Sequence, residues 1–253
     1  MNKLKLNYTS LSFLPILVCI PLGYQLINNI HFGGFKLFQE FLISAFNPKI
    51  DNEIIITVIN RLNETILIGF FSWLVSIIFG AIFGIISSNI FYKIFNIPNF
   101  FYRIIRFFLT IIRSIHEVVW GILLMQIYGI NFSIGIIAIC IPYIAVNSKV
   151  FAEQLETIDY KSFESINQIN APKFSSLLTL IWNPIINTFK NFGLYRLECS
   201  IRSTVILGLF GIGGIGTSIF LSFQTLNFRE LWTYLWSLAI LIILSGLIFK
   251  KIK

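Results

Sequence analysis

The sequence predicts an all-α, polytopic membrane protein with about six transmembrane helices. Of its 253 residues 56% are hydrophobic and only 12% are charged, whereas a soluble domain carries about 25% charged residues. The mean hydropathy is +0.82. The apolar residues form long runs, and the longest polar interruption covers residues 153–184. A bilayer span needs roughly 20 apolar residues, so most of the chain is expected in lipid.

The net charge of +8 at pH 7 could indicate nucleic-acid binding, because clustered Lys and Arg neutralise phosphates. However, the basic residues concentrate at the ends of the apolar runs, and no basic stripe with interleaved aromatic residues occurs. Nucleic acid is therefore excluded as a partner, and the lipid bilayer is expected instead. The three cysteines lie far apart, which excludes both a disulfide framework and a cysteine metal site.

Residues 1–64 are expected to form an N-terminal part outside the core. Its transmembrane helix covers Leu11–Ile30, and His31–Glu64 follows as an extracytoplasmic loop with an interfacial helix. This loop contains mixed charges, which disfavour a position inside the bilayer.

Residues 65–253 are expected to form the membrane core. Its first span, Thr65–Ser88, is the second expected span of the chain and contains Gly80 and Gly84. Two small residues four apart lie on one helix face and allow close helix contact. The remaining spans are expected at Arg103–Gly129, Phe132–Ala152, Ile185–Phe210 and Leu231–Phe249, with residues 153–184 as a cytoplasmic loop.

The distribution of basic residues predicts the orientation. With the N-terminus inside, most Lys and Arg residues fall on the cytoplasmic side, including Lys93, Lys149 and Lys173. Because cytoplasmic loops carry an excess of Lys and Arg, a cytoplasmic N-terminus and C-terminus are favoured.

One candidate site lies within the third expected span, where Arg113, His116 and Glu117 occur together. A charge in mid-membrane costs several kcal/mol unless it is paired or wetted. Arg113 and Glu117 are four apart, so an intrahelical ion pair is expected. Two interpretations remain: a structural pair near the membrane boundary, or a wet translocation face or gate.

A second cluster of Arg196, Glu198, Arg202 and Ser203 lies in the fifth expected span. Glu198 and Arg202 are again four apart, so both clusters are expected to face a shared interior. The planar fork of arginine matches phosphate-type oxygens. The pattern does not distinguish contact with a solute from locking of one helix against another.

A glycine loop contains Gly211, Gly213, Gly214 and Gly216, which match the G-x-G-x-x-G pattern of dinucleotide sites. That pattern needs a preceding strand, and here expected spans flank it on both sides. We expect the glycines to provide a tight turn and close packing. No catalytic residues, no metal ligands and no cofactor site are expected, and the absence of a P-loop lysine motif indicates that the chain is not an enzyme that hydrolyses nucleotide.

Three segments resemble the permease subunits of binding-protein-dependent ABC importers, most closely those of the phosphonate-uptake type. Arg113 to Trp120 resembles the R-S-I-P/H-E-L-V-W motif, and Leu194 to Gly216 resembles the L-Y-R-x-E-x-x-x-R-x-S…G-x-G-G-I-G motif. The polar interruption resembles the EAA loop of the family. Its residues expected to couple to an ATPase are Glu153, Asp159, Glu164, Ser165, Asn170 and Ala171.

The resemblance implies the type I (MetI-like) fold of ABC importer permeases and a homodimer in a bacterial inner membrane. It also implies two partners, a cytoplasmic ABC ATPase and an extracytoplasmic solute-binding protein. The cargo would be phosphonate or a related small oxyanion such as phosphite or phosphate. One alternative is a permease for methionine or another small organic solute. An alternative of another class is a membrane-embedded enzyme or a structural membrane protein, which predicts no ATPase partner.

Overall fold

A computed structural model describes residues 32–158 and 172–252. The chain divides into two compact units, Met1–Asn47 and Pro48–Lys253. The first unit contains helix α3 (Phe32–Ser44), and the expected span at Leu11–Ile30 lies outside the described residues. We call the second unit the core unit. It includes residues 48–64, which the sequence analysis assigned to the loop before the core.

Helix α4 (Asn52–Ile86) accounts for this difference. It begins after Asp51, whose backbone is extended, and Glu53 lies in its first turn, where a carboxylate favours the positive end of the helix dipole. The expected loop between Asn52 and Glu64 is therefore the first part of the same apolar helix that contains the expected span.

Helix α5 (Asn89–Phe95) follows α4, and the Ser88 side chain caps it by accepting a hydrogen bond from the Ile90 amide. The third expected span is not one helix. It consists of α6 (Phe100–Ser114) and α7 (Glu117–Tyr128), which are bent by 84° relative to each other.

The bend between α6 and α7 has a local cause. Ile115 is extended, and His116 is the N-cap of α7, where its side chain accepts a hydrogen bond from the Val118 amide. A helix must restart after an extended residue, and capping satisfies one of its free amides. The expected span from Arg103 to Gly129 therefore consists of two helices, which together are long and apolar enough for one broken span.

The next expected span agrees closely with α8 (Phe132–Leu155), which contains Pro142. After the gap in the described residues, α10 (Lys173–Thr188), a π turn (Phe189–Gly193) and α11 (Leu194–Gly208) follow without interruption. Gly193, the last residue of the π turn, is buried, and its carbonyl accepts a hydrogen bond of 2.7 Å from Trp73 Nε1. The core unit ends with α12 (Ile215–Gln224) and α13 (Phe228–Ile252).

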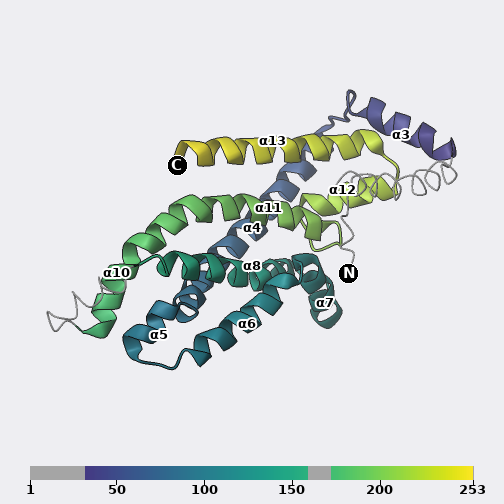
Figure 1. Ribbon diagram of the computed structural model, residues 1–253. Coiled ribbons are helices and arrows are strands. Elements are labelled where there is room, and N and C mark those ends of the chain that lie inside the picture. Colours follow the sequence, from purple (N-terminus) through teal and green to yellow (C-terminus); the bar gives the residue numbers. More distant parts are fainter. Residues whose placement is uncertain (1–31, 159–171, 253) are drawn as a thin grey trace, which may run out of the picture. The chain divides into compact units, whose positions relative to one another are not determined.

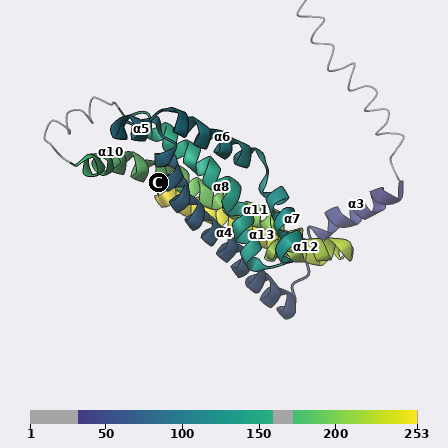
Figure 2. The ribbon, with the colours of Figure 1, turned by 90° about the horizontal axis from the view of Figure 1, so that it is seen from below.

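Helix α8 is the centre of the core unit. It packs against α4, α6, α7, α10 and α11, and Figure 2 shows α8 between α4 and α6. Helix α13 contacts α12, α11 and α4, and lies beyond α11 from α8 (Figure 1). A buried apolar cluster joins α4, α8, α11 and the glycine loop; its members are Ile68, Ala138, Ile139, Tyr143, Leu207 and Ile212.

The close contact predicted for Gly80 and Gly84 is confirmed at the crossing of α4 and α8. A Cβ placed on Gly80 would lie 2.5 Å from Asn147 Cβ, and one on Gly84 would lie 2.6 Å from Phe151 Cβ. Both distances are shorter than any side-chain contact allows, so only glycine permits this approach.

The described residues contain three helices that are long and apolar enough to cross a membrane, namely α4, α8 and α13, or four if α6 and α7 form one broken span. The fifth expected span corresponds to the continuous run of α10, the π turn and α11. This run carries the charged residues Lys190, Arg196, Glu198 and Arg202 within its apolar sequence. Within the described ranges all regular elements are helical, which agrees with the all-α membrane fold predicted from the sequence.

Candidate functional site

A chain of buried polar groups joins α7, α8 and α11. Glu117 lies in the first turn of α7 and is 9% exposed. Its Oε1 accepts a hydrogen bond of 2.5 Å from Ser203 Oγ, and Ser203 Oγ lies 2.8 Å from the Tyr143 hydroxyl. A serine hydroxyl has one proton, so Ser203 donates to Glu117 and accepts from Tyr143. We refer to Glu117, Ser203, Tyr143 and Arg196 as the polar core cluster.

Arg196 joins this cluster through the aromatic ring of Tyr143. The guanidinium carbon of Arg196 lies 3.7 Å from the ring centroid of Tyr143 and 5.8 Å from that of Phe192. A cation over an aromatic face is attracted by the ring quadrupole. Arg196 Nε is buried and has no hydrogen-bond partner among the described residues. Tyr143 therefore contacts a cation with its ring and the Ser203–Glu117 pair with its hydroxyl.

The N-terminus of α7 stabilises the Glu117 carboxylate. The positive end of a helix dipole favours a negative charge in the first turn. His116 Nδ1 lies 3.5 Å from Glu117 Oε2 and also accepts the hydrogen bond from the Val118 amide. These two contacts need different protonation states of Nδ1, since a protonated nitrogen cannot accept a hydrogen bond. In the structure, Nδ1 serves as the hydrogen-bond acceptor that caps α7.

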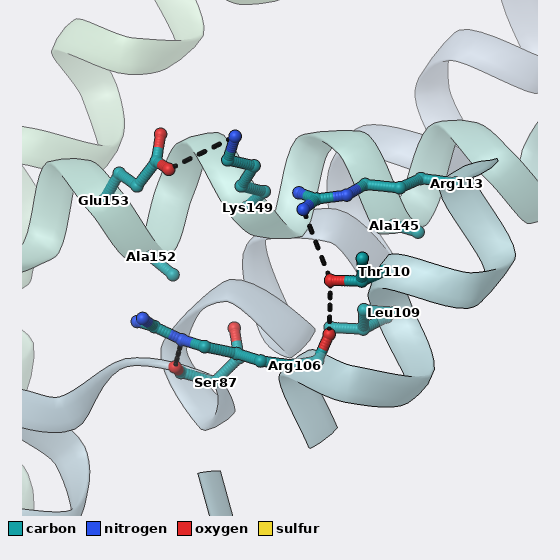
Figure 3. Close-up of a pocket in the computed structure, with 9 residues that line it drawn as sticks. All are labelled: Ser87, Arg106, Leu109, Thr110, Arg113, Ala145, Lys149, Ala152 and Glu153. Atoms are coloured by element: carbon teal, nitrogen blue, oxygen red, sulfur yellow. Dashed lines mark hydrogen bonds and ion pairs between the residues drawn. The ribbon is translucent and has the colours of Figure 1, made fainter. Parts of the chain in front are cut away.

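The predicted ion pair between Arg113 and Glu117 was wrong, because the bend at Ile115 and His116 separates their helices. Arg113 donates instead to Thr110 Oγ1, at 3.2 Å, within α6. It lines a cavity of about 150 Å³ between α6 and α8, shown in Figure 3. Arg113 is thus not part of the polar core cluster.

The predicted pair of Glu198 and Arg202 is confirmed as an ion pair within α11. The Arg202 side chain is 53% exposed. Because both partners belong to the same helix, this pair does not fasten α11 to a neighbouring helix. Of the residues predicted to share an interior, the structure brings together Glu117, Arg196 and Ser203.

The glycine loop is fastened to α4 by two side chains. Glu64 Oε2 accepts a hydrogen bond of 2.9 Å from the Gly214 amide, and Thr65 Oγ1 accepts one of 2.9 Å from the Ile215 amide. Arg61 forms an ion pair of 2.9 Å with the same Glu64 oxygen. The loop is therefore part of the packed core unit, and its amides are held by acceptors from a helix 150 residues earlier in the chain.

Backbone conformation and steric space explain why this loop contains glycines. Gly213 has φ +122° and Gly214 has φ +75°, values that side-chain-bearing residues rarely adopt. A Cβ on Gly216 would lie 2.1 Å from the Val205 carbonyl oxygen, so Gly216 allows α12 to approach α11. The element that precedes the loop is a helix, which agrees with the rejection of the dinucleotide interpretation.

Of the predicted coupling residues, the structure describes Glu153, which lies 3.5 Å from Lys149 in an exposed ion pair. Asp159, Glu164, Ser165, Asn170 and Ala171 lie outside the described residues. On either side of this gap, the end of α8 and the start of α10 pack together with α5 in one apolar cluster of Ile90, Ile94, Leu155, Leu177 and Ile181.

Three residues of these contacts were not identified from the sequence. Tyr143 lies in an apolar run next to Pro142, and Glu64 and Thr65 lie where the expected loop meets the first expected span of the core. A buried tyrosine usually finds a hydrogen-bond partner, which is the one signal that could have drawn attention to Tyr143. No local pattern connects Glu64 or Thr65 to the glycine loop.

The relatives found by sequence comparison are permease proteins. No protein-family model matches the sequence. The phosphite transport system permease protein PtxC of Stutzerimonas stutzeri is 25% identical over 156 residues, which cover 60% of this chain and 57% of that protein. The putative cryptic phosphonate transport system permease protein PhnE2 of Escherichia coli K12 is 28% identical over 94 residues, which cover 37% of this chain and 77% of that protein. The chain thus spans a little over half the length of the phosphite permease.

Among solved structures, the MetNI methionine ABC transporter in an inward-facing conformation matches with a TM-score of 0.69. The match covers 80% of this chain and 97% of that chain at 17% identity, so it establishes the fold and nothing about the cargo. This fold agrees with the helical core described above. The chain is thus similar in sequence to permease proteins of phosphite and phosphonate transport systems, and its fold is similar to that of the membrane subunit of a solved ABC transporter.

Proposed function

We propose that this chain is the membrane-spanning permease subunit of an ABC importer that moves phosphonate or a related small oxyanion, such as phosphite or phosphate. Two copies would enclose the translocation path in a bacterial inner membrane, with both termini of each copy in the cytoplasm. A separate cytoplasmic ABC ATPase would supply the energy, and an extracytoplasmic binding protein would deliver the cargo. The chain itself would carry out no catalysis.

The observation that carries this proposal is the hydrogen bond between Ser203 and Glu117. It joins the two segments that resemble motifs of phosphonate permeases, although these residues are 86 positions apart in the chain. Residues that a family holds in two separate motifs are expected to act together when they meet in space. Here they meet around Glu117, the only charged side chain that is buried among the described residues. Ionisable groups buried at membrane depth are typical of solute pathways.

The cluster also has the chemistry that an oxyanion needs. Arg196 is held in place by the Tyr143 ring, while its Nε has no partner among the described residues. An arginine fork that is pre-positioned and incompletely hydrogen-bonded suits phosphate-type oxygens. We propose that Arg196, Glu117 and Ser203 line the path and that the exposed pair of Glu198 and Arg202 faces it or the second copy.

The helices suggest how ATP hydrolysis would reach this cluster. The run of α10, the π turn and α11 is uninterrupted from Lys173 to Gly208. The run begins just after the gap in the described residues, within the segment that resembles the EAA loop. Its last part carries Arg196 and Ser203. Movement of the coupling segment by an ATPase would therefore displace α11 relative to α7 as a nearly rigid body, which is the motion that alternating access requires.

The proposal is tested by reconstituting the permease with its ATPase and binding protein and measuring ATP hydrolysis with added solutes. We expect stimulation by a phosphonate, phosphite or phosphate, and none by methionine. Stimulation by methionine alone would overturn the cargo assignment and leave the importer assignment intact. Absence of any ATPase after gentle purification from native membranes would instead support a membrane enzyme or structural protein.

A further inference from the structure

The cavity between α6 and α8 is a second place where basic side chains gather. Its lining contains three cations, Arg106, Arg113 and Lys149, and one carboxylate, Glu153. Arg106 and Arg113 belong to α6 and Lys149 to α8, with α7 between these helices in the chain, and Figure 3 shows the three side chains at the lining of the cavity. Like charges repel each other, so such a gathering is unfavourable unless negative charge offsets it.

Protein carboxylates offset two of these three cations. Arg106 forms an ion pair with Glu156 and also donates to the Ser87 carbonyl at 2.7 Å. Lys149 lies 3.5 Å from Glu153. Arg113 is half-buried, and within the described ranges its hydrogen-bond partner is the neutral Thr110 hydroxyl. The cavity therefore carries one positive charge that the described residues leave uncompensated.

The shape of the cavity fits a small ligand. Its volume is about 150 Å³, and the α8 side of the cavity consists of Ala145, Lys149, Ala152 and Glu153. The two alanines leave room beside Lys149, while Leu109 closes the opposite side from α6. A cavity of this size has space for several water-sized groups, which suits a tetrahedral oxyanion better than an amino acid or a nucleotide.

From this arrangement we infer that the cavity between α6 and α8 is a binding site for a phosphate-type oxyanion, with Arg113 as its principal ligand and Arg106 and Lys149 beside it. The planar guanidinium offers a fork of donors that matches two oxygens of such an anion. The site is separate from the polar core cluster, because Arg113 and Glu117 lie on helices that bend apart.

The position of the site indicates its place in transport. Glu153, which lines the cavity, is also the first residue of the proposed coupling segment. The site therefore lies at the end of α8 where the ATPase would bind. If the proposed function holds, an anion here is either cargo on its way out of the path or the phosphate of a lipid headgroup, and these two sources share the same chemistry.

The test uses the full-length permease without ATPase or binding protein, so it does not depend on transport. The protein is placed in nanodiscs of phosphatidylcholine, and binding of inorganic phosphate is measured by ³¹P NMR line broadening, with chloride as the control anion. We expect broadening by the wild type and an affinity about tenfold lower for Arg113→Gln, since a charge-assisted hydrogen-bond pair is lost. Arg113→Lys, which keeps the charge without the fork, is expected in between.

Arg103→Gln is the matched control. Arg103 lies on the same helix and in the same stripe of polar residues as Arg106, Thr110 and Arg113, but it is exposed and outside the cavity lining. It is expected to leave phosphate affinity unchanged. An equal loss in Arg103→Gln and Arg113→Gln would mean that phosphate responds only to total charge, and would overturn the inference.

A second arm distinguishes the two sources of the anion. In nanodiscs that also contain phosphatidylglycerol, unchanged phosphate binding indicates a site for free oxyanions, whereas loss of phosphate binding indicates that the lipid phosphate occupies it. Phosphatidylglycerol retained by the wild type in native mass spectrometry and lost in Arg113→Gln supports the lipid source directly. If neither phosphate nor phosphatidylglycerol binds in an Arg113-dependent manner, the inference is wrong, whatever the ATP hydrolysis assay shows.

Discussion

Ser203 on α11 donates a hydrogen bond to Glu117 at the first turn of α7, and both side chains are buried. This contact exists because α7 begins anew after the extended residue Ile115. Had α6 continued, Glu117 would lie on the same helix face as Arg113. The break between α6 and α7 therefore moves a carboxylate from a local ion pair to a contact between distant helices.

Replacing Ser203 by Ala tests this contact. The change leaves Glu117 and the Tyr143 hydroxyl without their shared partner in a buried position. We expect the free energy of unfolding to fall by about 1–3 kcal/mol, the cost of unsatisfied buried polar groups. Thermal unfolding of the purified protein in detergent measures it. Ser133→Ala, at an exposed position of α8, is the control and is expected to change little; equal effects of both would contradict the proposed role of Ser203.

The stacking of Arg196 on Tyr143 is tested by a double-mutant cycle. Tyr143→Phe keeps the ring, so Arg196→Gln should cost as much in that background as in the wild type. Tyr143→Leu removes the ring, so the same change should cost less, by about 0.5–2 kcal/mol. Unfolding measurements of the single and double variants give this coupling. A coupling of zero in the Leu background would show that Arg196 gains nothing from the ring.

Features that depend on local spacing could be predicted from the sequence. The pair of Glu198 and Arg202 follows from their spacing of four residues, and the contact at Gly80 follows from a small residue repeated on one face. The bounds of α8 were predicted within a few residues, because a span is defined by its own apolar composition.

Other features could not be predicted, for two physical reasons. The break between α6 and α7 has neither Gly nor Pro at its centre, and its N-cap is His116, whose side chain is an uncommon capping group. The link from Glu64 to the glycine loop joins residues 150 positions apart, and no local rule relates them. As a result, local spacing identified Glu117 and Ser203 as candidate residues but assigned the wrong partner to Glu117.

Thr65→Val tests the attachment of the glycine loop to α4. Thr65 is completely buried, and its hydroxyl is the acceptor for the Ile215 amide. Valine keeps the shape and removes the acceptor, so we expect a loss of about 1–3 kcal/mol in stability. Hydrogen exchange should become faster at Ile215.

Thr57→Val is the matched control for this change. Thr57 lies on the same helix, and its hydroxyl donates to the Glu53 carbonyl one turn earlier. Its replacement is expected to leave exchange at Ile215 unchanged. Faster exchange at Ile215 in both variants would show that α4 as a whole, and not the Thr65 hydroxyl, protects the loop.

Gly80→Ala tests the crossing of α4 and α8. The added methyl group would lie 2.5 Å from Asn147 Cβ, which is close to the backbone and cannot rotate away. We expect a loss of about 1–3 kcal/mol from overpacking, larger than the gain of roughly 0.5–1 kcal/mol that alanine brings to a helix. Gly246→Ala on α13 provides the comparison, because no heavy atom lies within 4 Å of the point that its methyl group would occupy. Thermal unfolding should show Gly246→Ala equal to or above the wild type and Gly80→Ala below it; the same change in both would mean that α4 and α8 do not need glycine where they cross.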